Sequence, residues 1–177
     1  MKKIFNNIFV DGFTGMTLGL FATLILGTAF TQLGAWVGGA VGAQLAAIGN
    51  VAKTLTGAGI GVGVAAKCNA DSLVTVSAAI AGMLGAFHSV TAVALGAVGE
   101  PLGAFVAAFA GIELGHLVSG KTKVDILVTP IVTIVTGCAV GLIVGPPISK
   151  FMTGLGAIIN WGTEQQPFIM GIVVSVL

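Results

Sequence analysis

Two glutamates and a histidine stand in an otherwise apolar stretch of this sequence. Glu100, Glu113 and His116 lie within ALGAVGEPLGAFVAAFAGIELGH, residues 94–116, where nearly every neighbour is Ala, Gly, Val, Leu or Phe. A carboxylate in apolar surroundings costs free energy unless it is paired, protonated or used to bind something. What such an acid can do therefore depends on the element that presents it.

Glu100 is the more informative of the two acids. It follows Gly99 and precedes Pro101, a pattern typical of the first turn of a helix. There the helix dipole stabilises a carboxylate, so Glu100 is either a capping acid at a membrane surface or an acid presented to a buried polar ligand. His88 lies upstream in the apolar run LGAFHSVTAV. Ionisable residues in such runs indicate ligand binding or gating, and the alternative for His88 is a hydrogen bond between helices.

Other motifs carry weaker chemical signals. Glu113 and His116 share one helix face, as in di-metal carboxylate bundles, but the second pair that those centres need is absent. We therefore expect local hydrogen bonding or an interfacial polar pair, no metal and no cofactor. GHLVSGKT, residues 115–122, matches a phosphate-loop pattern that works only between a strand and a helix. Apolar segments flank it here, which favours a cytoplasmic loop.

Two further groups of residues allow structural interpretations. Asn69 and Asp71 could line a polar path, but a turn in which Asp71 or Ser72 caps the next helix is favoured. Cys68 and Cys138 lie far apart without a CxxC spacing. They are expected to be inert, buried thiols.

Composition places the chain in a membrane. Hydrophobic residues make up 56% of its 177 residues and charged residues only 7%. Soluble domains carry about 25% charged residues, because a water-exposed surface has to be polar. The net charge of +1 gives no basis for nucleic-acid binding.

The apolar runs predict an all-α, polytopic membrane protein. A helix needs about 20 apolar residues to cross a bilayer. We expect about five full spans, at residues 13–33, 36–52, 73–95, 101–118 and 125–146. Residues 54–66 are short and glycine-rich and are expected to form a broken or re-entrant segment, which needs protein or water around its backbone. An amphipathic stretch with Trp161 at an interface follows, and residues 167–177 read as an unfinished span.

The arrangement of lysines and small residues adds an orientation and a packing mode. With Met1 in the cytoplasm, the positive-inside rule is satisfied. The lysines on the cytoplasmic side would be Lys53, Lys67, Lys121 and Lys123, with Lys150 outside. Small residues recur every four positions, which predicts closely packed helices. They are Gly103, Ala107, Gly111 and Gly115 in one stripe, and Gly137, Gly141 and Gly145 in another.

Several motifs after residue 99 carry a family resemblance. SGKTKVDILVTP, VGPPISKFM and INWGTEQQPFIMGI resemble enzyme IIC (EIIC), the membrane component of the bacterial phosphoenolpyruvate-dependent sugar phosphotransferase system. Within that family the chain is most similar to a stand-alone IIC-like branch. The resemblance covers nearly the whole chain and implies a single EIIC-like domain over residues 1–177. It corresponds to the N-terminal half of such a protein, so we expect a chain truncated at its C-terminus.

The resemblance implies a sugar permease of the bacterial cytoplasmic (inner) membrane. Its helices would bind and translocate a sugar, a IIB phosphocarrier would phosphorylate it, and the protein would be a homodimer. It also implies that Glu100, in the Glu-Pro motif, and His88 bind the sugar. Enzyme activity, as a phosphohistidine–sugar phosphotransferase, would belong to the complex, because this chain shows no phosphoryl-accepting residue. The alternatives are a transporter of another small solute on the same scaffold and a membrane sensor without transport.

Overall fold

Helices form every regular element that the structure describes. The computed structural model describes residues 7–88 and 94–165, together with Gly171 and Ser175. The all-α fold class is therefore confirmed. Most of the unfinished span expected over residues 167–177 lies outside the described residues.

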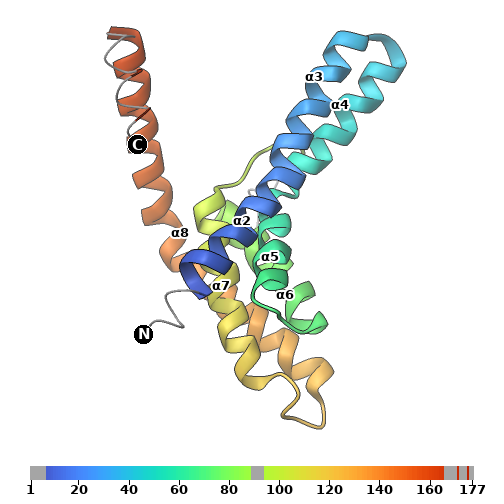
Figure 1. Ribbon diagram of the computed structural model, residues 1–177, viewed down its shortest axis with the longest axis vertical. Coiled ribbons are helices and arrows are strands. Elements are labelled where there is room, and N and C mark those ends of the chain that lie inside the picture. Colours follow the sequence, from blue (N-terminus) through green and yellow to red (C-terminus); the bar gives the residue numbers. More distant parts are fainter. Residues whose placement is uncertain (1–6, 89–93, 166–170, 172–174, 176–177) are drawn as a thin grey trace.

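The chain begins with one long helix made of four consecutive pieces. These are the π-helical η1 (Asn7–Gly12), α2 (Phe13–Leu20), the π-helical η2 (Phe21–Ile25) and α3 (Leu26–Val37). Together they contain a candidate membrane span, Val10–Val37, which confirms the span expected at 13–33. The chain then reverses at Gly38 and Gly39, whose φ angles of 66° and 60° suit glycine. Helix α4 (Gly39–Thr54) returns along α3, and the two form an arm that projects from the body (Figure 1).

Helices α4 and α5 (Thr56–Lys67) form one bent pair. Leu55 separates them with φ −80° and ψ 8°, and their axes differ by 56°. The separate span expected at 36–52 and the short segment expected at 54–66 are thus two parts of one apolar element. The bend lets α5 leave the arm and enter the body, where it packs against α2, α6 and α7.

The remaining helices complete the body. Helix α6 (Ser72–Phe87) ends before the span expected at 73–95 does, and residues 94–100 are not helical where the structure describes them. Helix α7 (Pro101–Val118) coincides with the span expected at 101–118. Helix α8 (Asp125–Gln165) contains the span expected at 125–146 and continues beyond it. Among the described residues, three helices are long and apolar enough to cross a membrane, or four if the bent pair counts as one span.

Helix α5 packs on two sides through alternating glycines. Residues four apart share a helix face, so glycine at every second position makes two stripes on different faces. Gly57 and Gly61 face α6: a Cβ on Gly57 would lie 2.7 Å from the carbonyl oxygen of Gly82. Gly59 and Gly63 face the first helix, and a Cβ on Gly63 would lie 3.2 Å from the backbone nitrogen of Gly19. Glycine is thus needed on both sides of α5.

The two predicted stripes of small residues pack as expected. A Cβ on Gly103 of α7 would lie 2.6 Å from the carbonyl oxygen of Gly85 on α6. Further along α7, a Cβ on Gly111 would lie 3.4 Å from the Cα of Gly137 on α8. Close approach of backbones is how helices gain packing energy in lipid, where apolar side chains gain little by leaving the solvent.

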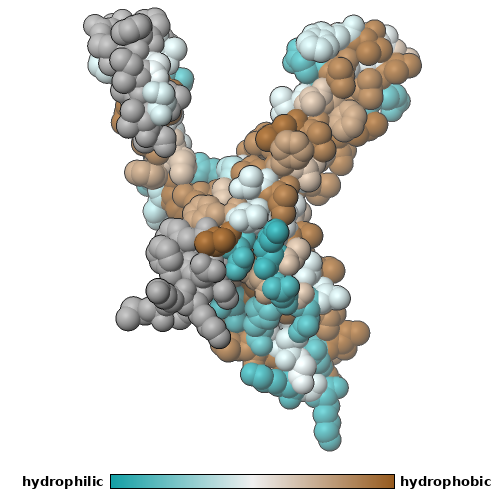
Figure 2. Space-filling model, viewed as in Figure 1, coloured by the Kyte–Doolittle hydropathy of each residue, from teal (hydrophilic) through white to brown (hydrophobic). Residues whose placement is uncertain are grey.

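The outer surface suits contact with lipid. Large apolar side chains point outward from the arm and from α8, for example Trp36, with 75% of its surface exposed, and Ile143, with 74%. Figure 2 shows hydrophobic side chains over much of the arm and hydrophilic ones at the opposite tip of the molecule. Together with the long apolar helices, this distribution supports a membrane protein.

The close approach of α2 and α5 predicts the effect of adding one methyl group. We expect Gly19→Ala to lower the free energy of unfolding by about 1–3 kcal/mol, because the new Cβ would lie 2.6 Å from the Cα of Ile60. Gly154→Ala is the matched control, because nothing lies within 4 Å of its Cβ position. Thermal unfolding of the purified proteins in detergent measures both. Equal stability of the two variants would contradict the packing described here.

Candidate functional site

His88 ends α6 in a left-handed conformation. Its φ and ψ are 53° and 10°, and its backbone N–H donates to the carbonyl of Leu84 at 2.9 Å. Histidine adopts this region more readily than most side chains other than glycine. The left-handed residue stops α6 and turns the chain, which is why the helix does not continue to residue 95.

The imidazole ring of His88 lies in a slot between two glycines. A Cβ on Gly103 of α7 would lie 2.7 Å from Cε1 of the ring, and a Cβ on Gly145 of α8 would lie 2.9 Å from the same atom. Only hydrogen at both positions leaves room for the ring. Nδ1 and Nε2 are both buried, and neither has a hydrogen-bond partner among the residues that the structure describes. The slot therefore holds the ring by shape and leaves its polar atoms free.

Glu100 is the N-cap residue directly before α7, at the helix start that the sequence predicts. Its backbone N–H donates to the carbonyl of Ala86 at 2.8 Å, and its carbonyl accepts from Ala104 N–H at 3.1 Å. Pro101 occupies the first turn. The side chain, however, makes no capping hydrogen bond, and its Oε2 is buried without a partner. The Glu100 side chain therefore does not cap α7 through a hydrogen bond.

The structure brings Glu100 and His88 to the same end of α7. Gly103, which contacts the His88 ring, lies three residues after Glu100 and so falls near the same face of the helix. Both residues flank the turn between α6 and α7. Leaving a buried polar atom without a hydrogen bond costs about 1–3 kcal/mol, so three such atoms at one place indicate a site for a polar ligand.

The turn carrying this site lies partway along the molecule. Helix α6 has 16 residues, which makes it about 24 Å long. That is less than the roughly 30 Å of a bilayer core. The α3–α4 arm and the C-terminal part of α8 both continue beyond the turn (Figure 1). The chain thus turns back at His88 and Glu100 while neighbouring helices run on.

The other acids and thiols form no comparable centre. Glu113 is exposed on α7 and His116 is half-buried in its last turn. No group of three or more His, Cys, Asp or Glu residues that could hold a metal is found in the described parts of the chain. Cys68 and Cys138 are free, half-buried thiols.

The phosphate-loop pattern begins within the end of α7 and continues into the turn before α8. Its first four residues are the last turn of α7, where a nucleotide-binding loop needs to follow a strand. The backbone N–H of Gly120 donates to Oδ1 of Asp125 at 2.9 Å, so a carboxylate of the chain already occupies this donor.

Asp71 precedes α6 as expected, but its Oδ2 accepts from the Ser119 hydroxyl at 2.6 Å instead of capping the helix.

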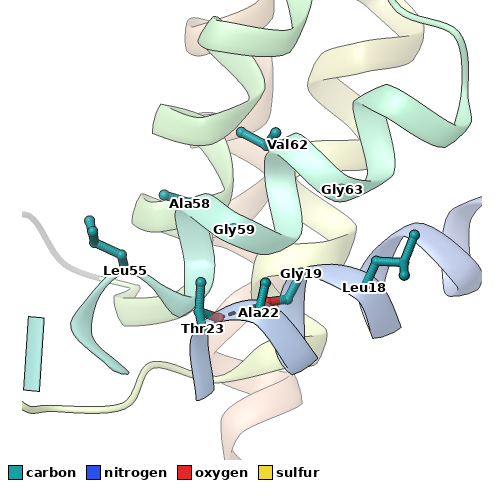
Figure 3. Close-up of a pocket in the computed structure, with 9 residues that line it drawn as sticks. All are labelled: Leu18, Gly19, Ala22, Thr23, Leu55, Ala58, Gly59, Val62 and Gly63. Carbon is teal, nitrogen blue, oxygen red and sulfur yellow. Dashed lines mark hydrogen bonds between the residues drawn. The ribbon is translucent and has the colours of Figure 1, made fainter. Parts of the chain in front are cut away.

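A groove between the first helix and α5 is a poor candidate for a sugar site. It has a volume of about 420 Å³ and is shown in Figure 3. Its lining residues are Leu18, Gly19, Ala22, Thr23, Leu55, Ala58, Gly59, Val62 and Gly63. The one polar side chain among them, Thr23, already donates to the carbonyl of Gly19 at 2.7 Å. The lining thus offers no charged group and no uncommitted hydroxyl proton.

Comparison with known proteins decides the family. A sequence model of the family described as "Phosphotransferase system, EIIC" matches residues 10–177. The chain belongs to this family. This EIIC protein is therefore a multi-pass membrane component of a sugar-transporting phosphotransferase system, and the expected resemblance is confirmed. Searches of curated proteins and of solved structures find no match to it.

The sequence of this EIIC protein singles out Glu100 and His88 but does not indicate the slot around the His88 ring. The stripe Gly137, Gly141 and Gly145 predicts helix packing in general, whereas in the structure its last glycine contacts the His88 ring. The position of Gly145 immediately before Pro146 and Pro147 is the one local signal that sets it apart.

The pKa of Cys68, which follows α5 outside the membrane-spanning helices, gives a testable pH dependence. Burial raises it to about 11, and the charges of Glu113 and Asp11 add to the shift. The thiolate therefore forms only near that pH, and alkylation by iodoacetamide should be slow at pH 8. The rate should rise with pH toward about 11 in a Cys138→Ala background, measured by mass spectrometry. Glu113→Gln should lower the pKa, and a midpoint near the ordinary value of about 8.5 would contradict the burial of this thiol.

Proposed function

We propose that Glu100 and His88 form the sugar-binding site of this EIIC protein. The observation that carries the proposal is the group of three buried atoms without partners, Oε2 of Glu100 and both ring nitrogens of His88. A sugar hydroxyl donates one hydrogen bond and accepts others, so it can satisfy a carboxylate and an imidazole together. The sugar class suits the site better than an apolar solute does.

The chemistry of the pair fits phosphoryl transfer to a bound sugar. A carboxylate accepting from a hydroxyl makes a strong, charge-assisted hydrogen bond. From that position Glu100 orients the hydroxyl and can take its proton as the phosphoryl group arrives. The phosphoryl group comes from the IIB partner on the cytoplasmic side, and enzyme activity belongs to that complex.

The reversal of the chain between α6 and α7, at His88 and Glu100, supports transport through this site. Because α6 is short, the pair lies between the ends of longer neighbouring helices. A ligand bound there is surrounded by α6, α7 and α8 instead of resting on the membrane surface. This is the placement that a permease needs for a substrate passing between two sides.

Sugar uptake tests the roles of the two residues. In vesicles or cells supplied with phosphoenolpyruvate, we expect Glu100→Gln to abolish uptake of the ¹⁴C-labelled sugar that the unmodified protein takes up best from a panel. We expect binding of that sugar to weaken about 10- to 100-fold, because a hydrogen bond to a charged group is lost. His88→Ala should weaken binding in the same direction.

Glu113→Gln is the matched control, because Glu113 is an exposed acid on the same helix. It should leave uptake unchanged. Normal uptake by Glu100→Gln would overturn the site. Uptake driven by an ion gradient and indifferent to phosphoenolpyruvate would assign the protein to the transport of another solute, and binding without flux would assign it to sensing.

We also propose a bacterial inner-membrane homodimer with a cytoplasmic N-terminus and one EIIC-like domain over residues 1–177. Lys67 supports this orientation because it is the last residue of α5, at an end that would face the cytoplasm. Lys121 and Lys123 support it because they lie between the ends of α7 and α8 on that side. Lys53, which we expected on the same cytoplasmic side, does not support this orientation. It lies at the α4–α5 break, and α5 separates it from Lys67 by about 18 Å along the helix axis.

Accessibility to a membrane-impermeant maleimide tests the orientation. In a background without Cys68 and Cys138, Lys123→Cys should react in inverted vesicles and Lys150→Cys in right-side-out vesicles. Both positions are exposed. The reverse pattern would invert the topology without affecting the sugar site.

A further inference from the structure

The segment that leads into Glu100 is tied to the break between α4 and α5. The backbone N–H of Gly96 donates to the hydroxyl oxygen of Thr54 at 2.6 Å, across 42 residues of sequence. Gly96 has φ 83°, and a Cβ there would lie 3.4 Å from the side chain of Asn50 on α4. The segment thus lies directly against the last turn of α4.

The other end of the segment is fixed to α6. Glu100 N–H donates to the carbonyl of Ala86 at 2.8 Å, and a Cβ on Gly99 would lie 3.0 Å from that same oxygen. The first turn of α5 reaches the same place, because a Cβ on Gly57 would lie 2.7 Å from the Cβ of Ala86. The residues just after the α4–α5 break and the residues just before Glu100 therefore both lie against Ala86.

Thr54 is suited to this link by its hydroxyl. A hydroxyl has one donor and two acceptor positions. The donor of Thr54 goes to the carbonyl of Asn50 at 2.9 Å, within α4, and an acceptor position takes the N–H of Gly96. Only 8% of the surface of Thr54 is exposed, so little water can replace the bond.

We propose that Thr54 is a positioning residue for Glu100. Its hydroxyl holds the 94–100 segment against the α4–α5 break, so the bend of the broken helix and the place of the Glu100 carboxylate are coupled. This role rests on the proposed function, in which Glu100 binds the sugar. Thr54 itself does not touch the sugar in this scheme.

Thr56 provides a matched control on the other side of the break. It is fully buried, and its hydroxyl donates to the carbonyl of Lys53 at 2.7 Å. That bond is local and does not reach the Glu100 segment. Thr56→Val and Thr54→Val therefore remove the same group from the same break, but only the second removes the link to Gly96.

Sugar binding to the purified protein is the first measurement, with the sugar that the unmodified protein takes up best in the uptake panel. We expect Thr54→Val to weaken binding about fivefold, the effect of one lost hydrogen bond. Thr54→Ser, which keeps the hydroxyl and its hydrogen bond, should keep affinity within about twofold of that of the unmodified protein. Thr56→Val should leave it unchanged. Equal losses from Thr54→Val and Thr56→Val, or no rescue by serine, would overturn the proposal.

Hydrogen exchange tests the link without any sugar. We expect amides in peptides covering residues 94–100 to exchange about fivefold faster in Thr54→Val and at the original rate in Thr56→Val. Unchanged exchange in Thr54→Val would overturn the link. Faster exchange with unaltered sugar binding would overturn the positioning role.

A double variant separates this proposal from the sugar site itself. If Thr54 acts through Glu100, Thr54→Val should have less than about a twofold effect on binding once Glu100→Gln is present. A full, additive loss would overturn the proposal. Unaltered binding in Glu100→Gln alone would overturn the sugar site, and with it this role of Thr54, while the exchange rates would still report whether the link exists.

Discussion

Direct contact between helix backbones is the interaction on which this structure depends. Helices in lipid gain little by burying large apolar side chains, so they associate through close packing. In α5, glycines on two faces bring the first helix and α6 to within contact distance of its backbone. Within the described parts of the chain, the fully buried apolar residues are accordingly few and modest in size, with Ile60 and Ile112 the largest.

The same close contacts create the polar site. The slot for His88 exists because Gly103 and Gly145 carry no side chain, and it grips the ring without offering a hydrogen bond. An imidazole in a slot lined by polar groups would have its nitrogens satisfied by the protein. Held by shape, the His88 ring leaves both nitrogens without a partner among the described residues. At the start of α7, Oε2 of Glu100 is likewise buried without a hydrogen-bond partner among the described residues.

Threonine hydroxyls show how the described helices deal with polar groups in an apolar setting. Most donate to a carbonyl one turn earlier in their own helix, as Thr23 and Thr133 do. This satisfies the hydroxyl proton locally and adds nothing between helices. Thr54 makes the same local bond and in addition accepts from Gly96. A residue type that is locally satisfied elsewhere thereby links two distant segments at the point where the broken helix meets the site.

Local and compositional properties of this protein were determined by the sequence alone. Membrane residence, the all-α class, the helix at 101–118, the start of that helix at Glu100 and the stripes of small residues all depend on composition or short spacings. Tertiary structure alone decided that α4 and α5 form one bent element, that α6 stops at His88 and that Gly145 meets its ring. These features depend on which distant residues come into contact. No local pattern encodes that choice, because a glycine stripe specifies close approach but not the partner that approaches.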